Sequence, residues 1–327
     1  MLLSLDQSLA HLSAKMSSPV AASPVRKAHK GLVRDDLLVL RQIFDLNHGK
    51  TASDRDLPND LILASSLPDS NIKDLLIVSL DVENPPCGTE LQNNSNYQLG
   101  LCVLDTRELG PGMLIGTQRT NSHELLRTFQ LVIGSAKYNK KAAHSYCFGE
   151  SQHISLPGLN AKLQELIPPE RDAVLVLHGG VWDLKFLEAA KLDLNHIYVI
   201  DTQKAAQHPL DLDHRCTMEE MLTLLGCPFG ELVLHTAGND ANFTLRALLL
   251  IAKTDACAAS DPYPIETERL LSLFEEIALG PVPLSNLQSH VQERRQIEQN
   301  QKEARARKQR RKRAALRAKE TQVKEGT

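Results

Sequence analysis

Apolar residues along the chain form two patterns, short continuous runs and longer segments with helical spacing. The runs lie at residues 75–80, 97–105, 173–177 and 197–200, a pattern typical of strands covered on both faces of a sheet. Helical spacing is found at residues 33–44, 157–166, 184–192, 218–225, 240–252 and 265–280. Two strands come first, and strands then alternate with helices. We therefore predict an α/β fold in which helices flank a mixed sheet.

Two segments lack a clear period. Residues 121–133 suit either a strand or a helix, and residues 145–155 suit a strand and a turn. The rest of the chain divides by composition. We predict a flexible leader at 1–30, a main domain at 31–255 that begins with an amphipathic helix packed on it, a terminal helix region at 256–282, and a basic tail at 283–327 that is a solvated helix or disordered.

Charge is distributed unevenly along the chain. The net charge is −3 at pH 7, but residues 302–319 carry ten Lys or Arg and one Glu, a charge of +9, so the other residues carry −12. This basic segment, Lys302 to Lys319, includes KQRRKR at 308–313. It supports three hypotheses: a signal for an import receptor, a non-specific nucleic-acid contact, or a solvated end without function. Because the body is acidic, we expect affinity for phosphate to come largely from this segment.

The amino-acid composition also indicates in which cellular compartment the protein is found. The six cysteines are dispersed without a CxxC pair, and no secretory leader is visible, which indicates free or buried thiols in a reducing environment. We expect Cys147, Cys227 and Cys257 to pack as small hydrophobic side chains. No run of about 18 apolar residues occurs, so we predict no membrane span. These features predict an intracellular protein of the nucleus, the cytoplasm or both.

Four acidic residues lie at the ends of predicted elements. Asp81 and Glu83 follow the first strand, and because alternate strand residues point to one face, they should project together. Asp183 and Asp240 each open a predicted helix, and His235 precedes Asp240 by five residues on a loop. Carboxylates suit Mg²⁺ or Mn²⁺, and a histidine beside them can accept a proton from water. The pattern indicates a metal site with a general base.

Three motifs contain these residues in order. DVE at 81–83 fits D-x-E, HGGVWDLKFL at 178–187 fits H-N-x-x-F-D-x-x-F-L, and HTAGNDA at 235–241 fits H-x(4)-D. Together they resemble the DEDDh group of 3′→5′ exonucleases, which has a ribonuclease H-like fold. The resemblance implies that Asp81, Glu83, Asp183 and Asp240 bind two Mg²⁺ or Mn²⁺ ions. It further implies that His235 deprotonates the attacking water, and that the substrate is the 3′ end of RNA or DNA.

A narrower likeness involves FGES at 148–151, IDTQ at 200–203 and LHTAGNDANFTLRALL at 234–249. These stretches are similar to a mostly fungal branch of exonuclease-like proteins, whose founder was linked to full activity of a DEAD-box RNA helicase. The likeness implies an RNA helicase or mRNA-export partner.

The chain also departs from the group's pattern. Gly179 replaces the usual Asn of the second motif, and Asn84-Pro85-Pro86 replaces the usual Thr-Gly step after the first. A second hypothesis is therefore a catalytically weak or inactive nuclease-fold module that binds RNA or an mRNA-processing or export partner. A third is an interaction protein acting through the N-terminal helix and the basic tail.

Several single residues carry a simpler interpretation beside the functional one. His235 could be a satisfied core histidine. We expect Trp182 to be a core side chain, with base stacking as the alternative, and His178 to have a supporting or packing role. Asp105 and Asp201 are expected to be turn or cap residues.

Overall fold

The structure of the chain is a computed structural model. It describes residues 30–47, 74–84, 96–109, 122–230, 233–258 and 262–283, with short helical pieces between residues 296 and 308. Apart from residue 30, the predicted leader lies outside the described residues, as does most of the predicted basic tail. Among the helices that are described, none combines the length and the apolar character needed to cross a lipid bilayer.

Six strands form one mixed sheet in the order β4-β3-β2-β1-β5-β6. The pairs β1–β2 and β2–β3 are antiparallel, whereas β1–β5, β5–β6 and β3–β4 are parallel. The strands are β1 (Leu75–Glu83), β2 (Tyr97–Asp105), β3 (Arg127–Ile133), β4 (Ser151–His153), β5 (Asp172–Leu177) and β6 (His196–Asp201). This arrangement confirms the predicted mixed sheet, in which the first two strands, β1 and β2, are antiparallel neighbours. It also shows that both ambiguous segments contain strands.

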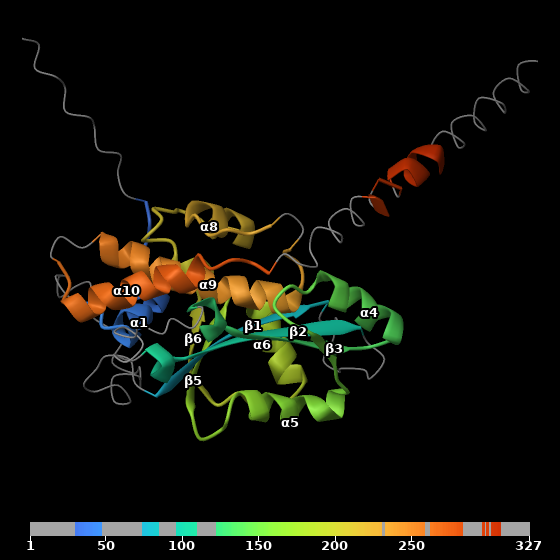
Figure 1. The fold of residues 1–327 in the computed structure, drawn as a ribbon, viewed down its shortest axis with the longest axis horizontal. Helices are drawn as coiled ribbons and strands as arrows, with labels where there is room; N and C mark the ends of the chain where they lie inside the picture. Colours follow the sequence, from blue (N-terminus) through green and yellow to red (C-terminus); the bar gives the residue numbers. More distant parts are fainter. Residues whose placement is uncertain are drawn as a thin grey trace, which may run out of the picture.

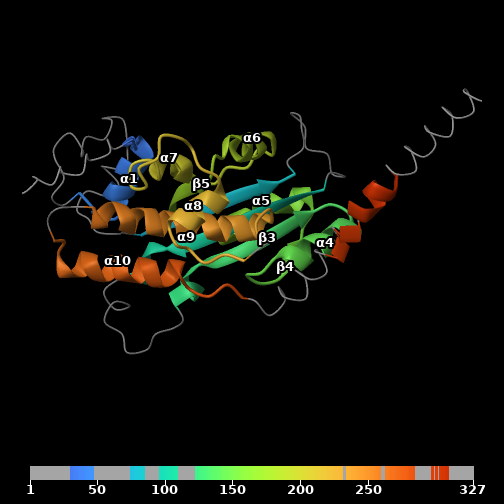
Figure 2. The same cartoon turned by 90° about the horizontal axis from the view of Figure 1, so that it is seen from above.

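Helices cover both faces of the sheet (Figures 1 and 2). The face that carries α9 is also covered by α1, α8 and α10, and the opposite face by α5 and α6. The helices used below are α1 (Asp35–Ile43), α4 (Ala136–Ser145), α5 (Leu156–Leu166), α6 (Val181–Ala189), α7 (Thr202–Ala205), α8 (Met218–Leu224), α9 (Ala237–Cys257) and α10 (Ile265–Ala278). The fold is therefore a three-layer α/β domain of the ribonuclease H-like type.

The 21-residue helix α9 lies at the centre of one layer. It contacts β1, β2 and β3 on one side and α10 on the other. Nearly every residue from Ala237 to Ala252 is buried, so its sequence lacks a wide polar face. At the sheet, the Ser79 hydroxyl donates a hydrogen bond to the carbonyl of Ala241, which fixes how α9 lies along β1.

A buried ion pair joins α1 to the C-terminal part of α9. The Arg41 guanidinium donates from Nε and Nη2 to the two carboxylate oxygens of Asp255, at 2.8 and 2.7 Å. Both side chains are at most 2% exposed. A bidentate pair at such a site positions α1 on the domain, and loss of one partner leaves a buried charge without its strongest interaction.

We predict that Arg41→Met lowers the free energy of unfolding by about 3–5 kcal/mol, because Asp255 stays buried without the guanidinium. Chemical denaturation at neutral pH measures the change. Lys30→Met serves as the control, because the Lys30–Asp213 pair is half-exposed and its loss should leave the denaturation midpoint almost unchanged. Equal midpoints for both variants would contradict the structural role given to the buried pair.

Candidate active site

The predicted acidic residues meet at one edge of the sheet. Asp81 and Glu83 occupy the last positions of β1, on the face that carries α9. The next strand, β5, runs parallel to β1, and the chain leaves it through His178-Gly179-Gly180 into α6. Asp183 lies in the first turn of α6, where its Oδ1 accepts a 2.8 Å hydrogen bond from the backbone N–H of Val82. This bond attaches the second motif directly to the first.

The third motif approaches from the helical layer. Asp240 lies in the first turn of α9, and its Oδ2 accepts a 2.9 Å hydrogen bond from the backbone N–H of His235. His235 has a positive φ of 66°, and its side chain is exposed to solvent. The imidazole Nδ1 is 4.0 Å from Oε1 of Glu83. Ligand-type atoms of Glu83, His235 and Asp240 all lie within 4.8 Å of one another.

Burial and mutual repulsion raise the pKa of these carboxyl groups. The pKa of Asp81 lies well above its usual value, first because the group is desolvated and then because Asp240, Asp183 and Glu83 are close to it. Desolvation, followed by the charge of Glu83, raises the pKa of Asp240 to about 8. Desolvation also raises the pKa of Asp183 to about 6 and, to a smaller extent, that of Glu83. No Lys or Arg is among the causes of these shifts.

The residues present fit a divalent cation. Oδ2 of Asp81 and Oδ1 of Asp240 are enclosed atoms without a hydrogen-bond partner, which is costly for carboxylate oxygens. Oxygen ligands of this kind suit Mg²⁺ or Mn²⁺, whose positive charge would offset the repulsion. The structure thus brings together all five residues that the motifs indicated, and the roles given to each of them remain predictions.

Two glutamines of the sheet hold the N-terminus of α9. Thr236, the residue before the helix, makes no side-chain cap, so the first backbone N–H groups need other acceptors. Gln98 Oε1 accepts from the N–H of Ala237 at 3.4 Å, and Gln130 Oε1 accepts from that of Gly238 at 3.3 Å. Sequence reasoning missed both glutamines, although a buried polar residue inside an apolar strand is a signal that could have indicated them.

Close approach of α9 to β2 depends on Gly100. This residue is paired with Asp81 across the β1–β2 ladder. A Cβ atom built on Gly100 would lie 1.9 Å from the carbonyl oxygen of Ala237, which is far inside van der Waals contact. The absence of a side chain therefore lets the first turn of α9, and with it Asp240, lie directly beside Asp81.

Other predictions for single residues had mixed outcomes. The core interpretation of His235 is wrong, because its side chain is 91% exposed. Trp182 is 63% exposed, so the core prediction is wrong there too, and base stacking is the interpretation that stays. The reason is that Trp182 and its neighbours Val181 and Leu184 lie on a side of α6 that no other described element covers. Lys185 Nζ lies 4.4 Å from the Trp182 ring centroid.

Supporting polar residues behave mostly as expected. His178 is largely buried with Nδ1 2.9 Å from the Thr202 hydroxyl, and burial lowers its pKa to about 4, which fits a packing role. Asp201 caps α7 through the N–H of Gln203. Asp105 accepts from the N–H of Arg107, as a turn residue does, and also forms an ion pair with Arg171 that sequence reasoning missed.

The cysteines follow the prediction less uniformly. Cys227 is buried and Cys147 partly buried, but Cys257, near the end of α9, is exposed, so its predicted packing role is wrong. Among the described residues every cysteine is free, and Cys87 lies outside them.

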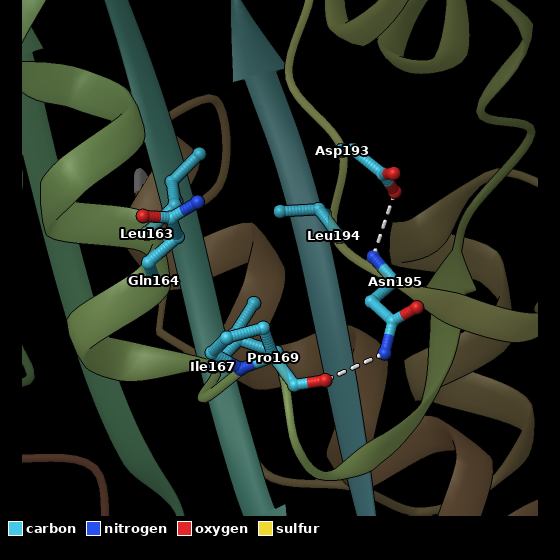
Figure 3. A pocket seen from close by; sticks show the side chains of 7 residues that line it. All are labelled: Leu163, Gln164, Ile167, Pro169, Asp193, Leu194 and Asn195. Atoms are coloured by element: carbon cyan, nitrogen blue, oxygen red, sulfur yellow. Dashed lines mark hydrogen bonds between the residues drawn. The ribbon is translucent and has the colours of Figure 1, made fainter.

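A cavity of about 220 Å³ lies away from these acids (Figure 3). Leu163 and Ile167 line it from the end of α5, and Pro169 and Leu194 from the loops before β5 and β6. Asn195 Nδ2 donates to the carbonyl of Pro169 at 2.8 Å across it. Because these loops precede the parallel strands, the cavity is at the opposite edge of the sheet from the acids.

The fold and the acid–histidine cluster define a nuclease domain of the DEDDh class. Residues 76–251, more than half of the chain, match the family model DEDDh_C, described as the C-terminal domain of DNA polymerase III subunit epsilon-like proteins. The chain belongs to this family. DEDDh nucleases are exonucleases that use divalent metal ions. No curated protein matches the chain.

We predict that Gly100→Ala destabilises the protein by about 1–3 kcal/mol and weakens its stabilisation by Mn²⁺, because the added Cβ displaces α9 and Asp240. Thermal unfolding with and without Mn²⁺ measures both effects. Gly158→Ala is the matched control. Its Cβ would meet the Ser155 hydroxyl at 3.3 Å, in α5, and should leave the Mn²⁺ effect intact. A normal Mn²⁺ effect in Gly100→Ala would contradict this role.

The raised pKa of Asp240 predicts how stability depends on pH in the presence of a chelator. At pH values between the usual pKa of an aspartate and about 8, Asp240 keeps its proton in the folded chain but has released it in the unfolded chain. The free energy of unfolding therefore falls as pH rises through this window. We expect Asp240→Asn to be more stable than the unaltered chain at pH 8, with the difference shrinking towards pH 5. Denaturation midpoints in EDTA test this, with Asp172→Asn, an exposed acid at the start of β5, as the control. A difference that does not change with pH would contradict it.

Proposed function

We propose that the chain is a metal-dependent 3′→5′ exonuclease that hydrolyses phosphodiesters of RNA or DNA. The observation that supports this most directly is the cluster of four carboxylates in which enclosed oxygens of Asp81 and Asp240 have no hydrogen-bond partner. Carboxylates that are buried without hydrogen-bond partners destabilise the fold, and such a cluster suits a site that binds cations. The family match supports exonuclease chemistry in general. The 3′→5′ direction, the two-metal mechanism and the substrate are our proposal.

In this proposal Asp81, Glu83, Asp183 and Asp240 would hold two Mg²⁺ or Mn²⁺ ions. When bound, these ions would supply positive charge to both the attacking and the leaving oxygen of an in-line displacement. Water attacks the phosphorus of the last phosphodiester, and the bond from phosphorus to the 3′ oxygen of the preceding nucleotide breaks. That oxygen takes up a proton from solvent and becomes the new 3′ hydroxyl, and the terminal nucleotide is released as a nucleoside 5′-phosphate.

His235 receives the proton of the water. Its imidazole is exposed at the mouth of the acid cluster, with Nδ1 towards Glu83, so Nε2 is the atom we assign to proton transfer. The nearby carboxylate of Glu83 stabilises the imidazolium that forms. The exposed ring of Trp182, next to Asp183 on α6, offers a platform on which a terminal base could stack.

One feature favours keeping the second hypothesis, a nuclease-fold module that binds RNA without efficient turnover. The residue after Glu83 is Asn84, which has a positive φ of 58° and donates to the Tyr138 hydroxyl at 3.2 Å. Related enzymes commonly have a Thr-Gly step there. Under this hypothesis, the narrower likeness at residues 234–249 supports an RNA helicase or mRNA-export partner.

The role of the basic segment, Lys302 to Lys319, is also a proposal. Residues 302–308 are helical and exposed, and residues 309–319 lie outside the described part of the chain. We propose that this segment binds nucleic acid or an import receptor, in keeping with a place in the nucleus, the cytoplasm or both.

We predict that the full chain with Mn²⁺ or Mg²⁺ shortens a labelled oligonucleotide from its 3′ end. Asp81→Asn should abolish this activity, because the acid lies at the centre of the cluster. His235→Ala should slow it about 10²–10⁴-fold, the usual contribution of a general base. The measurement is release of mononucleotides from RNA and DNA side by side.

Asp213→Asn, which changes an exposed acid outside the cluster, should keep full activity. If the Asp81→Asn variant still shortens the oligonucleotide, the activity comes from a contaminating nuclease or from another site, and the role proposed for the acid cluster is wrong. An oligonucleotide that is bound but never shortened would favour the binding module instead.

A further inference from the structure

Helix α4 is a basic element on the rim of the acid cluster. Its ten residues contain Lys137, Lys140 and Lys141 and no acidic residue. All three lysines are exposed, and none of them forms an ion pair with any residue that the structure describes. The body of the chain, with the basic segment set aside, carries a net charge of −12. Three clustered lysines therefore form an exception on an acidic body.

Polar contacts attach α4 to two of the motifs. Near its start, the Tyr138 hydroxyl accepts hydrogen bonds from Asn84, the residue after Glu83, at 3.2 Å and from Gln98 at 3.4 Å. At its end, the carbonyl of Ser145 accepts from Asn239, the residue before Asp240, at 2.8 Å. The helix consequently extends, over about 15 Å, from the neighbour of one acid to the neighbour of another.

A third contact fixes the middle of the helix. Gln130 Nε2 donates to the carbonyl of Ala142 at 3.0 Å, while Oε1 of the same side chain accepts from the first turn of α9. Gln130 is fully buried, so this link is rigid. The position of α4 is therefore set by the same residues that position Asp240.

Lys137 is unfavourably placed for the stability of the helix itself. Lys137 lies in the first turn, where the helix macrodipole disfavours a positive charge. Lys137 and Lys141 are four residues apart, a spacing at which like charges repel. Lys137 is therefore opposed by both effects and Lys141 by the second, and phosphate groups that pass along the rim would explain lysines at these positions.

We infer that α4 binds the sugar–phosphate backbone of a single-stranded nucleic acid whose 3′ end lies at the acid cluster. This inference rests on the proposed function and deepens it, because it names the surface that holds the strand. It also changes the expectation that affinity for phosphate comes largely from the basic segment at 302–319. Lysines contact phosphates as point charges and read no sequence, so binding by α4 should be indifferent to the bases.

The test compares two triple variants of the full chain, each carrying Asp81→Asn and assayed without divalent ions, so that no strand is cut. One replaces Lys137, Lys140 and Lys141 with Ala. The control replaces Lys162, Lys191 and Arg269 with Ala, which removes three positive charges from α5, from the end of α6 and from α10. Fluorescence anisotropy with a labelled single-stranded oligonucleotide gives the affinity at several salt concentrations.

For single strands, each phosphate contact contributes about 0.7 to the slope of log affinity against log salt. The α4 variant should therefore lose about 2 from this slope and bind more weakly at low salt, while the control keeps the slope of its parent. Circular dichroism and thermal unfolding show whether each variant is folded. If Lys140→Ala/Lys141→Ala is used because the triple variant unfolds, the expected loss is about 1.4.

Equal slopes for the α4 variant and its parent would overturn the inference, whether or not the unaltered chain cuts its substrate. Normal oligonucleotide binding combined with the loss of an acidic protein partner would overturn it too. A reduced slope supports it even when the unaltered chain with Mn²⁺ shortens no strand, an outcome that would refute the exonuclease proposal alone. The two proposals therefore fail separately.

Discussion

The geometry of the whole site depends on how closely the first turn of α9 approaches β2. At Gly100 the helix backbone occupies the space that a side chain would fill, and Gly100 is the cross-strand neighbour of Asp81. Asp240 is therefore brought to Asp81 by backbone contact between two layers. A fold that kept its sheet and helices but separated these layers by one methyl group would lose the cluster.

The close approach buries four carboxylates beside one another, which is unfavourable in free energy, and polar contacts offset part of this penalty. Four carboxylates meet with no Lys or Arg among the causes of their pKa shifts, and burial favours their protonated forms. The backbone N–H groups of Val82 and His235 each donate to one of the acids, and Gln98 and Gln130 satisfy the start of α9 from the sheet. These backbone groups have acceptors, whereas one enclosed oxygen each of Asp81 and Asp240 has no hydrogen-bond partner. Unpartnered carboxylate oxygens at this place are consistent with the cation site that we propose.

Sequence patterns predicted the elements well where burial is one-sided or complete. Continuous apolar runs identified β1, β2, β5 and β6, and helical spacing identified α5, α8 and α10, because both signals arise from contact with the core. The motifs indicated all five site residues, since D-x-E at a strand end and an acid in a first helical turn have defined directions. Residues 121–133 stayed ambiguous because only the second half of β3, from Gln130 onward, is buried.

Other features could not be predicted from the chain, because they depend on which surfaces the fold leaves uncovered. Trp182 looks like a core residue by type, yet its exposure depends on whether any element covers that side of α6. Gln98 and Gln130 interrupt apolar strands, and their role is defined by a helix that follows more than a hundred residues later. The basic surface of α4 could not be predicted either, because the negative net charge of the body does not show where three lysines lie together.

The departure at residue 84 connects these observations. Where related enzymes commonly have Thr-Gly, this chain turns at Asn84 with a positive φ, and the amide of Asn84 contacts Tyr138 of α4. Tyr138 also accepts from Gln98, whose other amide atom holds the first turn of α9. A change after the first motif is thus linked, through two hydrogen-bonding side chains, to the helix that carries Asp240. The altered step therefore connects the acid cluster to α4, the helix that we infer to bind the nucleic-acid backbone.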